Sequence, residues 1–475
     1  MSLVLLANRA PLRATADGWA PAIGGLATAL LPVLNAQGGA WVAMREPDDE
    51  APLRQAYPKD DPRFTVHRVV LDAAAFEGYY QGMANRVLWP LAHYLIEHTE
   101  PDRAFYEAYK TANRQFAEAA LAAAPEGAHF WVHDYHLMLV PALLRQARPD
   151  ARIGHFWHVP WPAPEVLRIL PSARSLVRGM LGADLVGFHT AGYAENFREA
   201  ARDLLGAVIE GERVRWENRT VCVEAHPIGI DVAEFEALGA AAETARLASV
   251  VREEAGVERL IVGVDRLDYT KGLLSRLAAF ERFLQEHPEW HRRVTLFQVA
   301  TPSRTGIPAY DQLKREVDET VGRINGQYAE GTWVPVRYRY RAYGAEELAA
   351  LYRAADVALI TPLRDGMNLV AHEFVATDDD GVLILSELTG AADYLTGAVL
   401  VNPYDTDGLI HALHTALTMP EEERRQRLAM MKAAVRRLEV HAWAERFLES
   451  LDERPRPSGD GEAAALPALA IPPPA

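Results

Sequence analysis

The chain has 475 residues, 49% of them hydrophobic, which is too long for one ordinary core and suggests two domains of similar size. Its 49 Lys and Arg against 65 Asp and Glu give a formal net charge of −16, which argues against a protein that binds nucleic acid through the phosphate backbone. Cys222 is the only cysteine, so an intramolecular disulfide and a cysteine-cluster metal site are excluded, and a reducing compartment is favoured.

The first apolar run, MSLVLLANRA, has no basic leader and no cleavage site, so it predicts a first strand and not a signal peptide. The next apolar run, residues 23–34, is shorter than the roughly 20 residues that a helix needs to span a bilayer. We therefore expect a cytoplasmic protein that has no membrane partner.

Apolar β-rich runs alternate with helical periodicity along the chain, which is typical of an α/β fold with doubly wound parallel sheets. In the first half the predicted strands are SLVLLA, HFWVH, RIGHFWH, DLVGF and TVCVEA. The pattern pauses at 226–245, where a Pro/Gly corner precedes an Ala-rich helix. It restarts with RLIVGVD, VTLFQVA, VPVRYRY, DVALIT and GVLILS. We predict two Rossmann-like halves with a hinge near 227–240.

The predicted organisation has four parts. One Rossmann-like domain spans 1–232 and a second spans 233–435. A long helical stretch rich in Glu and Arg occupies roughly 420–451, and we expect 436–453 to form a helix that packs back on the N-terminal domain. The segment 454–475 has the Pro, Gly and Ala bias of a disordered tail.

Charged and histidine residues follow six of the predicted strands. Because ligands of open α/β sheets bind outside the carboxyl ends of the strands, these segments are the candidate site. They are NRAP (8–11), HDYH (133–136), HVPWP (158–162), DRLDYTKG (265–272), ATPSR (300–304) and TPLRDGMN (361–368).

The stretch DRLDYTKG predicts a diphosphate site. Arg266 and Lys271 flank a tight turn, and the helix that starts near Gly272 presents free backbone N–H groups, so two cations and a helix N-terminus converge. A second interpretation is open at this point, in which the two cations are exposed and pair with Asp265 and Asp268.

The stretch TPLRDGMNLVAHEF predicts contacts to a nucleotide sugar. Asp365, at the strand end, can accept sugar hydroxyls. The backbone N–H groups of Asn368, Leu369 and Val370 begin a helix and can face a phosphate or a sugar. Glu373 lies five residues into this helix among apolar neighbours, where an unpaired carboxylate would be costly, so we predict that it binds ribose hydroxyls.

Several other sites are disfavoured or only weakly indicated. No G-x-G-x-x-G with a downstream acid and no Walker A motif occurs, which disfavours a dinucleotide dehydrogenase. The acidic runs at 47–50 and 377–381 are typical of solvated turns, and HDYH and HFWH lack the i, i+4 spacing of a zinc site. We predict no metal and no cofactor. Arg9 could clamp a phosphate, although a lone loop arginine is more often solvated, and the glycine pair at 24–25 is a weak phosphate signal.

A set of longer motifs runs in order along the chain, from residue 1 to about 450. They are NRAP, IGGL, YYQGMANRVLWPLAHY, WVHDYHL, IGHFWHVPWPAPE, DLVGFHT, HPIGID, VDRLDYTKGL, ATPSR, GRINGQY, TPLRDGMNLVAHEFVA and VNPYD. In this order they resemble the trehalose-6-phosphate synthase family. The resemblance implies a metal-independent GT-B glycosyltransferase whose two Rossmann-like domains face each other across a cleft. Such an enzyme moves glucose, with retention, from a nucleotide diphosphate glucose to glucose 6-phosphate and forms α,α-trehalose 6-phosphate.

The resemblance also implies roles for the residues that match the motifs. The implied catalytic residues are Arg266, Lys271, His158, Asp134 and Asp365. The implied donor contacts are Gly25, His158, Arg266, Lys271, Asp365, Asn368, Leu369, Val370 and Glu373. The implied acceptor contacts are Arg9, Tyr80, Trp89, Asp134 and Arg304. Taken alone, Tyr80 and Trp89 look like core aromatics.

The resemblance further implies the partners of the chain. The N-terminal domain would take the acceptor, glucose 6-phosphate, and the C-terminal domain the nucleotide diphosphate glucose. UDP-glucose is the expected donor, while GDP-glucose and ADP-glucose stay open. No nucleic acid is expected, and a homo-oligomer is open. Because no phosphatase signature follows the last motif, we expect a separate trehalose-phosphate phosphatase to act downstream.

The stretch VAMREPDDE, after Trp41, departs from the family pattern and leaves the acceptor open. The alternatives are a glucosylglycerol-phosphate synthase, a pseudo-glycosyltransferase that joins cyclitols and, in a different class, a catalytically silent sugar-phosphate sensor. Retaining hydrolases use a covalent carboxylate intermediate. The family instead implies a front-face route in which the leaving phosphate helps to deprotonate the acceptor, so catalysis would rest on positioning and leaving-group electrostatics.

Overall fold

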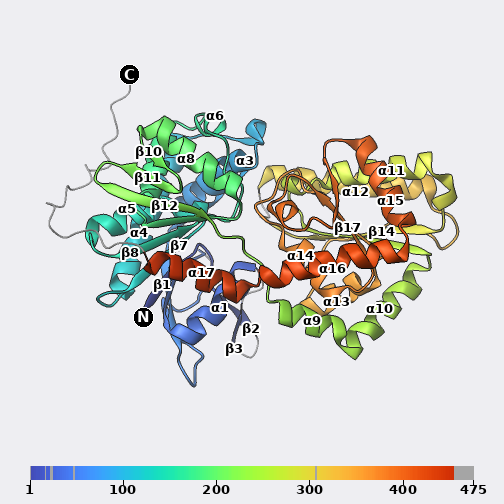
Figure 1. Ribbon diagram of the computed structural model, residues 1–475, viewed down its shortest axis with the longest axis horizontal. Helices are drawn as coiled ribbons and strands as arrows, with labels where there is room; N and C mark the ends of the chain where they lie inside the picture. The colour runs from blue at the N-terminus through green and yellow to red at the C-terminus, as the bar shows by residue number, and fades with distance from the viewer. Residues whose placement is uncertain (1, 16–17, 22–24, 47–48, 305–306, 454–475) are drawn as a thin grey trace. The chain divides into compact units, whose positions relative to one another are not determined.

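The computed structural model describes residues 2–15, 18–21, 25–46, 49–304 and 307–453. The chain divides into two compact units (Figure 1). The second unit is Ile228–Val440, and the first contains the residues before Ile228 and those after Val440. Each unit has its own largely parallel sheet with helices, so the predicted α/β class with two Rossmann-like halves is confirmed.

The first unit is built on a mostly parallel sheet. Its strands are β1 Leu3–Leu6, β4 Gly39–Arg45, β5 Arg54–Tyr57, β6 Phe64–Val70, β7 His129–His133, β8 Arg152–Phe156, β9 Leu185–Phe188, β10 Val208–Glu210, β11 Arg213–Trp216 and β12 Arg219–Ala225. Their order in the described residues is β10-β11-β12-β9-β8-β7-β1-β4-β6-β5. Neighbours from β12 to β6 pair in parallel, and the edge strands pair antiparallel. A separate hairpin joins β2 (Leu12–Thr15) to β3 (Gly18–Pro21).

Helices of the first unit connect these strands. They are α1 Gly25–Gln37, α2 Ala73–Phe76, η1 Glu77–Leu88, α3 Trp89–Ala92, η2 Ile96–His98, α4 Arg103–Ala123, η3 Tyr135–Leu137, α5 Val140–Ala147, α6 Pro164–Leu167, α7 Ala173–Met180, α8 Ala191–Leu205 and α17 Val440–Asp452. The five strands predicted for this half correspond to β1, β7, β8, β9 and β12. The sequence did not indicate β6, because its buried residues alternate with half-buried polar ones and leave no continuous apolar run.

The second unit has a fully parallel sheet. Its strands are β13 Arg259–Arg266, β14 Val294–Thr301, β15 Val336–Arg339, β16 Val357–Ile360, β17 Val382–Ser386 and β18 Val399–Val401. In the described residues their order is β15-β14-β13-β16-β17-β18. The five strands predicted for this half are all present, and the short β18 is an addition.

Helices surround this second sheet. They are α9 Val232–Ala240, α10 Ala242–Ala255, η4 Tyr269–Lys271, α11 Leu273–Glu286, η5 Pro288–Trp290, α12 Pro308–Tyr328, α13 Ala345–Ala354, α14 Leu369–Thr377, η6 Gly390–Asp393, α15 Thr406–Thr418 and α16 Glu421–Arg437. Side chains of α11, α12 and α15 pack with those of the strands in one buried core.

The long helical stretch predicted at 420–451 is two helices, because the chain breaks after α16 at Leu438. A Cβ atom at Gly229 would lie 1.5 Å from the Leu438 carbonyl oxygen, so the glycine of HPIGID allows this close crossing. The following helix, α17, is drawn in red along the sheet of the first unit (Figure 1). Its Trp443 and Phe447 rings lie 5.3 and 4.7 Å from the ring of Trp131 in β7. The predicted tail, 454–475, lies outside the described residues.

Two smaller points concern the described part of the chain. None of its helices combines the length and the apolar character that crossing a membrane requires. Cys222 is buried as a free thiol in β12, the strand predicted from TVCVEA.

Candidate active site

In the second unit, two of the predicted motifs meet at the carboxyl ends of the neighbouring strands β13 and β16. The backbone N–H of Leu363 donates to the carbonyl of Thr270 at 2.8 Å, which joins TPLRDGMN to DRLDYTKG. Gly272 has a φ of +65°, and a Cβ atom there would lie 2.6 Å from the Thr361 carbonyl oxygen. Glycine is therefore required where the two loops approach each other.

Lys271 and Asp365 form an ion pair between these loops. Lys271 Nζ lies 2.5 Å from Asp365 Oδ2, and the two side chains are only 11% and 15% exposed. Asn368 Nδ2 donates to the same carboxylate oxygen at 3.1 Å. The backbone of Asp365 is fixed by a bond from its N–H to the Leu388 carbonyl at 3.1 Å. The Lys271 ammonium group, which belongs to DRLDYTKG, is therefore held by a carboxylate of TPLRDGMN.

Asn368 caps the helix that follows. It has a φ of +78°, which asparagine tolerates better than most residues, and its side-chain oxygen accepts from the Ala371 N–H at 3.2 Å. The first N–H groups of a helix have no acceptor inside it. The half-buried Leu369 and Val370 therefore present the positive end of α14 beside Lys271.

Lys271 does not pair as the second interpretation of the sequence expected, whereas Arg266 is exposed, as that interpretation has it. Lys271 pairs with Asp365 of the other motif. Asp265 pairs instead with the buried Arg276 of α11, and that pair belongs to the core. Arg266, at the end of β13, is exposed.

Asp268 is a fully buried carboxylate that holds Arg304. Arg304 Nη1 lies 2.5 Å from Asp268 Oδ2, and the Tyr310 hydroxyl donates to the same oxygen at 3.2 Å. Burial alone would raise the pKa of Asp268, but the charges of Arg304, Arg266 and Lys271 outweigh it and lower the pKa to about 2. The Asp268 carboxylate is therefore ionised at neutral pH and pairs directly with Arg304.

Glu373 has a partner that the sequence did not indicate. The Tyr352 hydroxyl, from helix α13, donates to Glu373 Oε2 at 2.9 Å. Burial raises the pKa of Glu373 to about 7 in spite of this hydrogen bond. The carboxylate expected to meet the ribose is therefore paired, and it titrates near neutral pH.

In the first unit, the structure brings Arg9 and Tyr80 together. Arg9 Nη2 donates to the Tyr80 hydroxyl at 3.1 Å, and the Arg9 carbonyl accepts from Trp41 Nε1 at 3.1 Å. The neighbouring Tyr79 is buried and donates to Asn8 Oδ1 at 2.8 Å. Both tyrosines come from the π-helix η1, which therefore fixes the end of β1.

Asp134 and His158 meet at the carboxyl ends of β7 and β8. Asp134 has a φ of +71°, and its Oδ1 accepts from the His158 N–H at 3.2 Å. A non-glycine residue in this region is strained, and such strain often marks functional sites. His133 Nδ1 lies 3.1 Å from His158 Nε2. Burial, with the neighbouring His133, His189 and His155, lowers the pKa of His158 well below its usual value, so the imidazole is neutral.

The remaining predicted residues are less exposed or only partly described. Trp89 is 5% exposed, and its ring lies 4.2 Å from that of His93 and 5.8 Å from that of Tyr135, next to Asp134. Trp89 is therefore buried among other rings, as expected for a core aromatic. Gly25 begins helix α1, and the two residues before it, Ile23 and Gly24, lie outside the described residues.

Four contacting residues were missed by the sequence reasoning. His133 and Tyr79 lie inside quoted motifs, so the motifs carried a signal for them. Tyr352 and Tyr310 lie in helices α13 and α12, far along the chain from the carboxylates they contact, and no local pattern pointed to them.

Comparison with known proteins places these residues in a family. The model of glycosyltransferase family 20 matches residues 3–453. A trehalose-6-phosphate synthase of Mycobacterium avium is 43% identical over 467 residues, which cover 95% of each chain. A bifunctional trehalose-6-phosphate synthase/phosphatase of Thermoproteus tenax is 41% identical over 95% of this chain, which spans 63% of that longer protein.

Solved structures resemble the whole described fold. An alpha,alpha-trehalose-phosphate synthase (UDP-forming) from Burkholderia xenovorans, in complex with glucose-6-phosphate, has a TM-score of 0.89 and 35% identity over 95% of this chain and 100% of that one. A trehalose-6-phosphate structure from E. coli, bound with UDP-2-fluoro glucose, has a TM-score of 0.89 and 34% identity over 96% of this chain and 100% of that one.

Proposed function

The chain belongs to glycosyltransferase family 20, and we propose that it transfers glucose from UDP-glucose to glucose 6-phosphate and forms α,α-trehalose 6-phosphate. In this reaction the bond between the donor's anomeric carbon and the diphosphate breaks. A bond from that carbon to the anomeric oxygen of glucose 6-phosphate forms on the same face. The proton of the acceptor hydroxyl passes to the leaving diphosphate, so UDP is the second product.

The cation cluster of the second unit is the observation that carries this proposal. Arg266, at the end of β13, and Lys271, paired with Asp365, lie with the N-terminus of α14 at the carboxyl ends of a parallel sheet. A diphosphate that gains negative charge as it leaves is the ligand that such a set of donors would stabilise. Lys271 is already held by Asp365, so little reorganisation is needed when the donor binds. Arg304, which Asp268 holds, stays the predicted contact of the acceptor phosphate.

We assign the sugar and ribose contacts to carboxylates and histidine of known geometry. Asp365 would accept hydroxyls of the donor glucose with the part of its carboxylate that Lys271 leaves free. Glu373 would accept the ribose hydroxyls when it is ionised. In the first unit, Asp134 and the neutral His158 would position sugar hydroxyls, and Arg9 with Tyr80 would bind the acceptor phosphate.

Two relatives support the choice of substrates. The Burkholderia xenovorans structure contains glucose-6-phosphate, and the E. coli structure contains UDP-2-fluoro glucose. We also propose that a phosphatase consumes the product, because the Thermoproteus tenax relative is named for both activities. The assignment of 1–232 to the acceptor and of 233–435 to the nucleotide sugar remains a proposal.

A substrate panel tests the function. Initial rates are measured with UDP-, GDP- and ADP-glucose, each combined with glucose 6-phosphate, glycerol 3-phosphate and free glucose, and the product linkage is read by NMR. We expect the highest kcat/KM for UDP-glucose with glucose 6-phosphate, and the same rate in the presence of EDTA. A strong preference for glycerol 3-phosphate would make the chain a glucosylglycerol-phosphate synthase. Binding of sugar phosphate without turnover of any donor would make it a sensor.

A further inference from the structure

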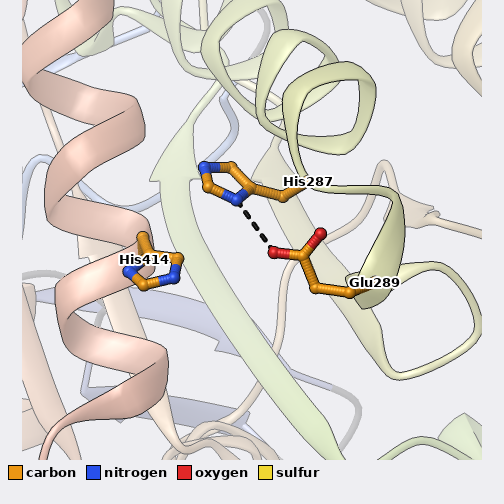
Figure 2. Close-up of side chains that lie close together, drawn as sticks. All are labelled: His287, Glu289 and His414. Atoms are coloured by element: carbon orange, nitrogen blue, oxygen red, sulfur yellow. Dashed lines mark hydrogen bonds and ion pairs between the residues drawn. The ribbon is translucent and has the colours of Figure 1, made fainter.

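A cluster of two histidines and one glutamate lies in the second unit (Figure 2). His287 follows helix α11, Glu289 lies in η5 and His414 lies in α15. The candidate ligand atoms all lie within 4.8 Å of one another. His287 Nδ1 lies 3.0 Å from Glu289 Oε1, and the two imidazole rings are 4.9 Å apart.

Packed helices hold the two imidazoles in place. Helices α11 and α15 lie against each other, with Leu284 and Leu413 in the same buried core. Arg282 of α11 also pairs with Asp407 of α15 at 2.7 Å, between one and two helical turns before the cluster. The His287 ring packs on that of Phe283 at 4.9 Å. The cluster therefore rests on a fixed framework, although its own side chains are partly open to solvent.

The cluster is distant from the proposed transfer site. Lys271 precedes α11, and His287 follows its last residue. The 14 residues of this helix correspond to about 21 Å at 1.5 Å per residue. Binding at the cluster is therefore separable from binding at the carboxyl ends of the strands.

We propose that His287, Glu289 and His414 bind a zinc ion, with water completing the coordination. Two imidazole nitrogens and one carboxylate form a ligand set that zinc takes in proteins. Tetrahedral ligands at Zn–N distances of 2.0–2.1 Å lie about 3.4 Å apart, so these side chains need only small rotations. Magnesium and calcium prefer oxygen ligands and should not compete.

The charge of the cluster also suits a divalent cation. Glu289 adds one carboxylate to the two imidazole nitrogens, and an anionic oxygen ligand beside two nitrogen ligands suits a divalent cation. No local sequence pattern indicates this site, because His414 lies far along the chain from the other two ligands. The fold alone brings the third ligand to the pair His287 and Glu289.

The test uses the full chain after treatment with EDTA and removal of the chelator. Zinc chloride is titrated into the wild type, into H287Q and H414Q, and into H411Q as the matched control. His411 is an exposed histidine of the same helix and is outside the cluster. We expect one zinc ion per wild-type chain, at least tenfold weaker binding in H287Q and H414Q, and unchanged binding in H411Q. Magnesium chloride should give no binding signal at the same concentrations.

Thermal melting provides an independent readout. Zinc should raise the melting temperature of the wild type and of H411Q, and should raise it less in H287Q and H414Q. If H414Q fails to fold, the comparison of H287Q with the wild type and H411Q decides whether the cluster binds zinc. Equal zinc affinity in all four proteins, or equal weakening in H411Q, would overturn the proposal. Absence of zinc binding to the wild type would also overturn the proposal.

Discussion

Replacing Tyr352 by phenylalanine removes one hydroxyl, which donates the 2.9 Å hydrogen bond to Glu373 Oε2. It keeps the aromatic ring, which packs edge-on against Phe374 at 6.1 Å. Burial already raises the pKa of Glu373 to about 7, against the effect of this hydrogen bond. Because the hydroxyl stabilises the ionised carboxylate, its removal raises the pKa of Glu373 further.

The size of this change follows from the hydrogen bond. A hydrogen bond to a charged group contributes about 1.5–3 kcal/mol, and one pKa unit corresponds to about 1.36 kcal/mol. The midpoint of the Glu373 titration should therefore move up by roughly one to two pH units in Y352F. If the ionised carboxylate binds the ribose, Y352F should keep about a tenth of the wild-type kcat/KM for UDP-glucose near pH 7.5 and approach the wild type above pH 9.

The assay is the pH profile of kcat/KM for UDP-glucose at saturating glucose 6-phosphate. In the wild type this quantity should rise with pH through a midpoint near 7. Y404F is the control, because Tyr404 is 63% exposed. A Y352F midpoint equal to or below that of the wild type would refute the reasoning. So would a loss of equal size at every pH, because that would indicate damaged packing and not an altered titration.

Three further predictions test the same site. The pKa of Glu373 in the folded chain lies above its ordinary value of 4.5. Its protonated form therefore stabilises the fold fully below about pH 4.5, and this contribution to the free energy of unfolding is lost as the pH rises toward 7. Glu373→Gln should therefore melt at a higher temperature than the wild type at pH 8, and this gain in melting temperature should shrink at pH 5. An equal gain at both pH values would contradict the prediction. Lys271→Ala and Arg266→Ala should each lower kcat by about 10²–10³ with a small change in melting temperature, whereas a large loss of stability with little kinetic loss would indicate structural ion pairs. Arg9→Ala should raise KM for glucose 6-phosphate far more than KM for UDP-glucose, with the exposed Arg13→Ala as the control; equal effects on both substrates would argue against a phosphate contact.

The sequence predicted well those features that depend on short stretches of chain. Strands such as β1 are apolar at every position because they are buried on both faces of a parallel sheet. The rule that ligands bind at the carboxyl ends of such strands then placed Lys271 and Asp365 at one edge, and they are in contact. The fold class and the meeting of two motifs were therefore within reach of the sequence.

Features that depend on distant partners were not predictable in this way. Glu373 was recognised as a buried carboxylate that needs a partner, but Tyr352 lies on another helix and its hydroxyl leaves no periodic signal. Arg304 was expected to bind a phosphate, and its contact with Asp268 became visible only when the two loops were folded together. The break at Leu438 depends on a close approach to Gly229, which no helix propensity encodes.

If the cluster binds the donor, the charges around Asp268 bear on how strongly it would hold the diphosphate before and after the glycosidic bond breaks. Arg266, Lys271 and Arg304 carry three positive charges, and Asp268 and Asp365 carry two negative ones, so these five groups sum to a single positive charge. The two carboxylates limit the attraction for the diphosphate of an intact donor. When the glycosidic bond breaks, additional negative charge develops on that diphosphate, and the same fixed cations would stabilise it more strongly than before. Under the proposed function, these cations should therefore contribute more to the transition state than to binding of the intact donor, and their loss should lower kcat more than it raises KM for the donor.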